Sequence, residues 1–326
     1  MFEDVSIVIL AAGQGTRMKS RMAKVLHCAG GKPLIAHTIA AARALAPPER
    51  IFVVVGHQAE QVAAAVHAAG VQSFLQASQA GTGHAVMCGE TLLRPLGGLL
   101  MVINGDCPMV RPESLQMLLR LYRETGSSAA MITTDLDDPT GYGRIVRRPN
   151  GDVAAIVEHK AATPGQLAIR EMNAGFYCFD AAAFWKHIHQ VGTDNPAGEY
   201  YLTDMIAILI GAGLRVTALK IADSSELLGI NNRVELAAVD RLLRERTARR
   251  LMLDGVTIER PDTVTIDDSV RIGMDTVIQP FARILGDTVI GENCRIGASS
   301  IIENSHLGDR VEVFPFSMIS ASTLDD

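Results

Sequence analysis

The sequence predicts an α/β fold: a doubly wound, mostly parallel sheet, followed by a linker helix and the first coils of a parallel β-helix. Short apolar runs alternate with helical segments in the N-terminal two thirds, and each run ends in glycine or polar residues. Near the C-terminus isoleucines recur every six residues, a period typical of a parallel β-helix. We therefore expect a large domain over 1–231, a linker helix over 232–255 and an incomplete β-helix over 256–326.

Three runs rich in β-branched residues predict buried strands of a parallel sheet. These runs are residues 5–10, 51–56 and 99–103. Helices are expected between the strands, over residues 33–45 and 58–69. Ligands bind beyond the carboxyl ends of the strands in such sheets, where Gly13 and Asp106 fall.

The linker helix is predicted by leucine and valine residues at helical spacing, from Leu236 to Leu251. The six-residue period begins after Gly255, and the isoleucines that carry it are Ile266, Ile272, Ile278, Ile284, Ile290, Ile296 and Ile302. The period then continues one residue early, at Leu307. We expect one aliphatic residue per face of each coil, and a coil end that exposes unpaired strand edges.

Composition excludes several classes of function. The net charge is −6 and aromatic residues make up 5% of the 326 residues, which argues against a nucleic-acid partner. No apolar run reaches the length of a membrane span, and the N-terminus is acidic where a secretory signal would be basic. Five scattered cysteines without a C-x-x-C pair suit a reducing compartment. We therefore expect a cytoplasmic protein.

The first chemical motif is the glycine-rich turn after the first strand, residues 10–18. Backbone N–H groups of such a turn can approach phosphates closely, although Gly-x-Gly alone is also compatible with an ordinary βα turn. Met18 stands where a dinucleotide fingerprint needs glycine, and the Gly-Lys-Ser/Thr of a Walker loop is absent. Four cations follow, as a triphosphate would require for charge compensation. They are Arg17, Lys19, Arg21 and Lys24.

The second motif is Asn104-Gly105-Asp106, at the end of the third predicted strand. An aspartate in this place either caps the following turn or ligates a metal ion. Mg²⁺ commonly takes one or two protein oxygens and completes its shell with substrate phosphates, so Asp106 with a distant second ligand is a candidate magnesium site.

Together these motifs, with Lys24-Val25-Leu26-His27, resemble those of the bacterial N-acetylglucosamine-1-phosphate uridyltransferases, a family of nucleotide-diphospho-sugar transferases with a Rossmann-like domain and a left-handed β-helix. The resemblance covers nearly the whole chain. It implies that Arg17 and Lys24 are catalytic and that Asp106 and Asn231 hold Mg²⁺. It also implies a set of substrate-binding residues. These are Leu10, Ala11, Ala12, Gly13, Gln76, Gly81, Thr82, Asn104, Gly105, Gly143, Glu158, Asn173 and Asn231.

Within that set the resemblance assigns Gln76 and the 81–85 segment to uracil, and Gly143, Glu158 and Asn173 to the amino sugar. A glutamine amide can form paired hydrogen bonds with the uracil edge. We expect His84 to be structural, and residues 199–204 to be mainly scaffold with Tyr201 near the pocket. Three positions depart from the family pattern. They are Ala23 for proline, Asn104 for an aromatic residue and Ala174 for threonine.

The reaction implied by the resemblance is transfer of UMP from UTP to N-acetylglucosamine-1-phosphate. It yields UDP-N-acetylglucosamine, a precursor for peptidoglycan and the cell wall, and pyrophosphate. The resemblance also implies a homotrimer formed through the β-helix. The acetyltransferase of full-length relatives would lie beyond Asp326, so we expect that activity to be absent. The alternatives are transfer to another sugar-1-phosphate or from another nucleotide, and a non-catalytic regulatory subunit of the same fold.

Overall fold

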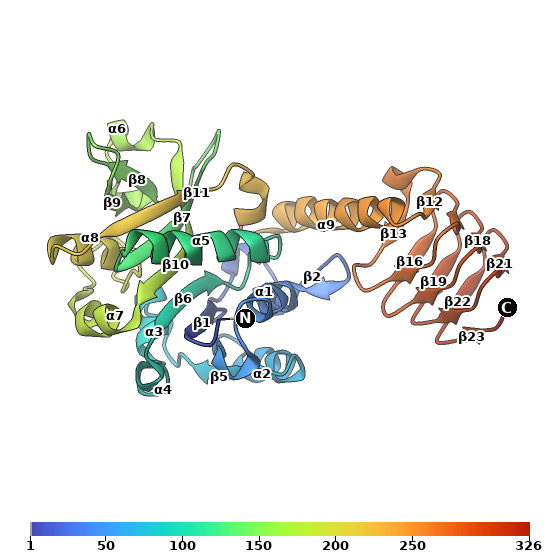
Figure 1. Ribbon diagram of the computed structural model, residues 1–326, viewed down its shortest axis with the longest axis horizontal. Coiled ribbons are helices and arrows are strands. Elements are labelled where there is room, and N and C mark those ends of the chain that lie inside the picture. Colours follow the sequence, from blue (N-terminus) through green and yellow to red (C-terminus); the bar gives the residue numbers. More distant parts are fainter. Residues whose placement is uncertain (1) are drawn as a thin grey trace. The chain divides into compact units, whose positions relative to one another are not determined.

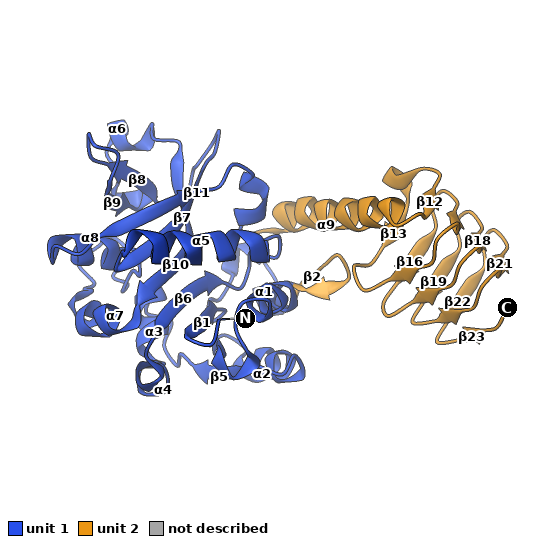
Figure 2. Ribbon diagram, viewed as in Figure 1, with its two compact units in different colours: residues 1–26, 34–231 blue, residues 27–33, 232–326 orange. Residues whose placement is uncertain are grey.

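The computed structural model describes residues 2–326 and divides into two compact units. The first unit contains residues 1–26 and 34–231, and the second contains residues 27–33 and 232–326 (Figure 2). No helix in the described part of the chain is both long enough and apolar enough to cross a membrane.

The first unit is built on a twisted sheet whose strands lie in the order β11-β7-β10-β6-β1-β4-β5 (Figure 1). Its strands are β1 (Val5–Leu10), β4 (Ile51–Val55), β5 (Gln72–Leu75), β6 (Leu99–Asn104), β7 (Ala129–Asp135), β10 (Glu171–Asp180) and β11 (Val216–Lys220). β1 pairs in parallel with both β4 and β6, while β10 runs antiparallel to β6 and β7. The hairpin of β8 (Arg144–Arg147) and β9 (Val153–Val157) extends from β10. The predicted mostly parallel sheet is therefore confirmed.

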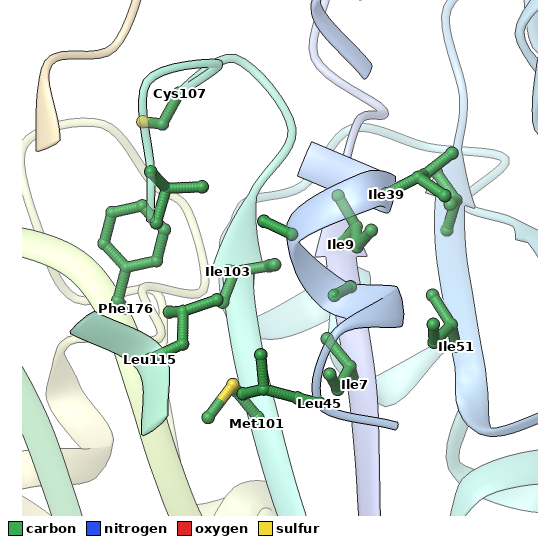
Figure 3. Close-up of a cluster of buried hydrophobic side chains, with 14 of the residues drawn as sticks. Ile7, Ile9, Ile39, Leu45, Ile51, Met101, Ile103, Cys107, Leu115 and Phe176 are labelled. Carbon is green, nitrogen blue, oxygen red and sulfur yellow. The ribbon is translucent and has the colours of Figure 1, made fainter. Parts of the chain in front are cut away.

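Helices cover both faces of this sheet because its central strands bury both faces. In β1, Ile7 and Ile9 contribute to one apolar cluster and Val8 to the other, as the two-residue period of a strand requires. Figure 3 shows Ile7 and Ile9 packed with Ile103 of β6 in the first cluster. That cluster is covered by α1 (Leu34–Arg43), α2 (Ala59–Ala68) and α5 (Pro112–Thr125). The second is covered by α3 (Thr82–Met87), α7 (Ala181–His187) and α8 (Asp204–Gly211).

The second unit begins with the long helix α9 (Arg233–Leu253). Asn232 caps this helix, because its side-chain oxygen accepts hydrogen bonds from the backbone N–H groups of Val234 and Glu235. The helix lies within the predicted 232–255 segment. Three four-stranded parallel sheets follow in the described residues and form the faces of a left-handed β-helix.

Each predicted isoleucine of the six-residue period lies in one of these short strands. The strands are β12 (Thr257–Ile258), β13 (Thr265–Ile266), β14 (Arg271–Ile272), β15 (Val277–Ile278), β16 (Arg283–Leu285), β17 (Val289–Ile290), β18 (Arg295–Ile296), β19 (Ile301–Glu303), β20 (His306–Leu307), β21 (Glu312–Val313), β22 (Met318–Ser320) and β23 (Thr323–Leu324). Thr265 pairs with Arg283, so a coil takes 18 residues, whereas Val289 pairs with His306, 17 residues on. The one-residue slip of the period is therefore a shortened corner before β20.

One part of the second unit comes from early in the chain. β2 (Cys28–Ala29) and β3 (Lys32–Pro33) form a small hairpin. Its Gly30 N–H donates to Asp240 of α9 at 2.8 Å, and its Gly30 carbonyl accepts from the backbone N–H of Asp268 at 3.0 Å. Lys32 forms an ion pair with the Asp268 side chain at 2.7 Å. No pattern in the sequence singles out this exchange.

Candidate active site

A cavity of about 560 Å³ opens at the carboxyl ends of β1 and β6 in the first unit. It is lined by Leu10, Ala11, Ala12, Gly13, Gln14, Gly15, Thr16, Lys24, Val25, Gln76, Gln79, Gly81, Thr82, Ala85, Asn104, Asp106 and Glu199. Most of the residues that the sequence assigns to the nucleotide lie in this set. We call it the nucleotide-side cavity.

The glycine-rich turn forms one wall of the nucleotide-side cavity. Its entry is held by backbone hydrogen bonds from Ala11 N–H to the Val54 carbonyl and from His57 N–H to the Ala12 carbonyl, both 3.1 Å. Gly15 has a left-handed φ of 62°, and a Cβ there would lie 2.7 Å from Cβ of Lys24. Glycine at this position therefore satisfies both the turn and the close approach of Lys24.

Four predicted catalytic and metal-binding side chains lie together at this cavity. Lys24 and Asp106 form an ion pair whose side chains are only 16% and 19% exposed. Asn231 Oδ1 accepts a hydrogen bond from Arg17 Nη2 at 2.9 Å and a longer one from Lys24 Nζ at 3.5 Å. Residues more than 200 positions apart therefore form one polar cluster, which we call the charged cluster.

The oxygen atoms of the charged cluster suit a hard divalent cation. Asp106 and Asn231 offer carboxylate and amide oxygens, the ligand types that Mg²⁺ prefers. The described residues contain no group of three or more His, Cys, Asp or Glu side chains placed to hold a metal ion. The neighbouring Cys107 thiol donates to Asp106 at 3.6 Å, and burial raises its pKa well above the usual value, so this thiol stays neutral.

The base side of the cavity is built by Gln76 and the start of α3. The Gln76 backbone N–H donates to the Val55 carbonyl at 2.8 Å, and its side-chain Nε2 donates to the Gly81 carbonyl at 3.0 Å. Gly81 has φ 113°, and a Cβ there would lie 2.5 Å from the Tyr200 carbonyl oxygen. The Thr82 hydroxyl accepts from Leu202 N–H at 3.0 Å. These contacts leave little freedom to the Gln76 side chain.

A second cavity of about 270 Å³, the sugar-side cavity, adjoins the first. It is lined by Leu10, Thr82, Asn104, Gly141, Tyr142, Gly143, Glu158, Asn173, Ala174, Gly175, Tyr177, Glu199, Tyr201, Leu202 and Thr203. The three residues that the sequence assigns to the sugar are in this set. Glu199, which the sequence placed in scaffold, lines both cavities, as do Leu10, Thr82 and Asn104.

The polar side chains of the sugar-side cavity are held by hydrogen bonds. Glu158 accepts from the Thr203 hydroxyl at 3.1 Å, and burial raises the pKa of the Glu158 carboxyl. Asn173 donates to the Tyr177 hydroxyl at 2.6 Å. Asn104 donates to the Ala174 carbonyl at 3.3 Å, so the residue that replaces the family's aromatic ties β6 to β10.

Three of the predicted residues do not line either cavity. Gly105 lies beneath them, where its N–H donates to the Leu10 carbonyl at 2.9 Å, so it joins β1 to β6. Arg17 and Asn231 meet the nucleotide-side cavity only through the charged cluster.

Sequence reasoning missed the role of Arg144, which directly follows Gly143 in the run Gly141-Tyr142-Gly143-Arg144. Its side chain is almost fully buried, and its Nη1 donates to the carbonyls of Pro139 at 2.7 Å and Tyr142 at 2.6 Å. Arg144 therefore fixes the loop that presents Gly143 to the sugar-side cavity. The available signal in the sequence was an arginine directly after a Gly-x-Gly run.

This fold and this site define a nucleotidyltransferase. The family model of the MobA-like NTP transferase domain matches residues 7–254, and the model of the bacterial transferase hexapeptide, in six repeats, matches residues 269–304. The bifunctional protein GlmU of Solibacter usitatus is 53% identical over 309 residues, which is 95% of this chain and 66% of that protein.

GlmU of Koribacter versatilis is 44% identical over 94% of this chain and 66% of its own length, and GlmU of Lactobacillus delbrueckii subsp. bulgaricus is 44% identical over 98% and 69%. The chain belongs to the GlmU family, which confirms the family expected from its motifs. It spans about two thirds of the length of these relatives.

Proposed function

We propose that this chain transfers UMP from UTP to N-acetylglucosamine-1-phosphate, giving UDP-N-acetylglucosamine and pyrophosphate. Membership of the GlmU family supports the reaction class. The observation that carries the proposal is that two cavities share Leu10, Thr82 and Asn104, with the charged cluster beside the larger one. A nucleoside triphosphate in one cavity and a sugar phosphate in the other would meet at their phosphates.

The proposed step is an in-line displacement. A phosphate oxygen of the sugar phosphate attacks the α-phosphorus of UTP, a new P–O bond forms, and the bond to pyrophosphate breaks. The attacking oxygen is already anionic, so no general base is required. Arg17 and Lys24 would neutralise charge on the triphosphate, while the N–H groups of the glycine-rich turn hold its oxygens.

The metal that fits this site is Mg²⁺, held by Asp106 and Asn231. When bound it supplies charge neutralisation and alignment for the phosphates. Lys24 has to leave Asp106 to reach the triphosphate, which frees the carboxylate for the cation. The ion pair of Lys24 and Asp106 thus keeps both groups in place until the substrates separate them.

Substrate choice is assigned to side chains on either side of the phosphates. Gln76, with the backbone of Gly81, would recognise uracil, because both line the nucleotide-side cavity. Glu158, Asn173 and the Gly143 backbone would hydrogen-bond the amino sugar. Ala174 leaves room where the family usually has threonine.

The wider setting is proposed from the same family. The hexapeptide repeats support a homotrimer formed through the β-helix. Free thiols at Cys28, Cys88 and Cys107 support a reducing, cytoplasmic location. The product would then feed synthesis of the cell wall.

The test is pyrophosphate release from the chain with Mg²⁺, UTP and N-acetylglucosamine-1-phosphate. Glucosamine-1-phosphate, glucose-1-phosphate and CTP serve as parallel substrates. We expect rapid release only with UTP and the N-acetylated sugar. Release with another sugar alone would keep the reaction and replace the sugar assignment. No release with any pair, from a folded sample, would favour a regulatory subunit.

A further inference from the structure

The Gln76 side chain contacts His84 as well as Gly81. Gln76 is 3% exposed, and its Nε2 lies 3.0 Å from the Gly81 carbonyl oxygen and 3.0 Å from Nδ1 of His84. The Gly81 carbonyl can only accept a hydrogen bond. The Gln76 side-chain nitrogen, and not its oxygen, therefore has to face the Gly81 carbonyl.

This geometry uses both N–H donors of the Gln76 amide. One goes to Gly81, and the other goes to His84 if Nδ1 is unprotonated. The proton of the neutral His84 ring then sits on Nε2, 3.7 Å from the Cys88 sulfur, a weak acceptor. The backbone carbonyl of Gln76 accepts a hydrogen bond from Gln79 Nε2 at 3.1 Å, whereas its side-chain Oε1 makes no hydrogen bond to the described residues. Oε1 is therefore the group left for a ligand in the nucleotide-side cavity, which Gln76 lines.

We infer that His84 is a positioning residue that selects uracil over cytosine by holding the Gln76 amide with its oxygen toward the base. The inference rests on the proposed use of this cavity for UTP. Uracil carries an N3–H donor and cytosine carries an N3 acceptor. A fixed Oε1 accepts a hydrogen bond from uracil N3–H, but it faces the lone pair of cytosine N3, with which it cannot form one.

The inference also refines the expected recognition mode. A glutamine whose N–H groups are both engaged cannot form a paired hydrogen bond with the base edge. Gln76 therefore contributes one acceptor, and its orientation carries the selectivity. His84 is thus more than a packing residue against Tyr200, whose ring centroid lies 6.1 Å from that of His84.

Two variants separate orientation from packing. His84→Phe keeps a ring of similar size but removes the acceptor, whereas His84→Asn keeps an acceptor oxygen close to the place of Nδ1. The measurement is the ratio of kcat/KM for UTP to kcat/KM for CTP. We expect this ratio to fall about tenfold in His84→Phe, with a higher KM for UTP and a similar kcat, as for one lost buried hydrogen bond.

In His84→Asn the ratio should stay within about threefold of the wild-type value, since one hydrogen bond replaces another. An unchanged ratio in His84→Phe would overturn the inference, as would an equal fall in both variants. Melting temperatures of the two variants identify any loss that comes from poor folding. If one variant does not fold, the UTP-to-CTP ratio of the other variant and the nitrogen-15 NMR spectrum of His84 still test the inference.

The protonation of the ring is measured without substrates. Nitrogen-15 NMR of His84 in the free protein at neutral pH should show an unprotonated Nδ1 and a protonated Nε2. A proton on Nδ1 would overturn the inference even if UTP is turned over. Conversely, wild-type protein that releases no pyrophosphate from UTP contradicts the proposed function, and the ratio of UTP to CTP dissociation constants then tests His84 alone.

Discussion

The nucleotide-side and sugar-side cavities adjoin in one unit, yet they are built differently. The first is walled by the backbone of the glycine-rich turn, and its cations are held by polar partners: Lys24 by the Asp106 carboxylate and Arg17 by the amide oxygen of Asn231. The second is walled by side chains held by hydrogen bonds, such as Asn173 with Tyr177. The charged side chains of the first cavity therefore have to exchange partners when phosphates bind, whereas the side chains of the second are already oriented for the sugar.

The difference follows from what each cavity has to recognise. A triphosphate carries several charges, and before it binds, the ion pair of Lys24 with Asp106 keeps these two partly buried groups from lacking a partner. A sugar offers hydroxyl groups, for which fixed hydrogen-bonding side chains are sufficient. Changes to the charged groups of the first cavity should thus alter turnover, and changes in the second should alter sugar affinity.

Removal of the divalent metal gives the largest expected effect. Chelation with EDTA should reduce pyrophosphate release by roughly a thousandfold, because a bound metal supplies several kcal/mol of charge stabilisation. Excess Mg²⁺ should restore it. Asp106→Asn should act in the same way, whereas Asp138→Asn, which changes an exposed carboxylate outside both cavities, should not. Full activity in EDTA would contradict a metal-dependent role for the charged cluster, and with it the proposed difference between the two cavities.

Lys24→Ala should reduce kcat by about a hundredfold or more, the loss seen when a comparable transition-state stabiliser is removed. The variant also frees Asp106, so the Mg²⁺ concentration for half-maximal activity should fall. Arg21→Ala removes a nearby exposed cation that does not line the cavity and serves as the control. A higher Mg²⁺ requirement in Lys24→Ala would show that the ion pair does not compete with the metal.

Arg144→Met should raise the KM for the sugar phosphate about tenfold and leave the KM for UTP unchanged, because two charged hydrogen bonds to the 139–142 loop are lost. Steady-state kinetics with each substrate varied in turn provides the measurement. Arg148→Met is the matched control, since Arg148 is exposed. An equal rise in both KM values would mean that the loop serves both cavities.

Glu158→Gln should have the smallest effect, and the size of that effect on stability should depend on pH. Burial raises the pKa of Glu158 above 4.5, with the hydrogen bond from Thr203 opposing the shift. The folded state therefore favours the protonated carboxyl, and its contribution to stability is lost as pH rises from 4.5 through the raised pKa. The glutamine variant should melt higher than the wild type at pH 7, and the difference should vanish below pH 4.5. A difference independent of pH would exclude this cause.

Local periodicity made much of the fold predictable. The β-branched runs predicted β1, β4 and β6, and the isoleucine period predicted the β-helix together with the short corner before Leu307. Both patterns arise because neighbouring residues share one packing environment. The antiparallel β10 and the β8–β9 hairpin were not predicted, because their partners are chosen by long-range packing.

The candidate site likewise has a part that the sequence predicts and a part that it does not. The glycine-rich turn and Asp106 stand out because each follows a strand. The contacts of Lys24 with Asp106, of Asn173 with Tyr177 and of Gln76 with His84 carry no signal along the chain, since they depend on side-chain geometry in the folded state. The family pattern indicated where those residues lie along the chain, and the folded structure shows which of their atoms form the contacts.

The hairpin of β2 and β3 has a consequence for the order of assembly during protein synthesis. It leaves the ribosome early, but Lys32 and its partner Asp268 are separated by 236 residues. At the usual elongation rate of 5–20 residues per second, that interval is roughly ten to fifty seconds. During this time the hairpin lacks its partners in α9 and the first coil, while the residues of the first unit can already fold. The hairpin can therefore form its contacts with Asp240 and Asp268 only after α9 and the first coil have been synthesised.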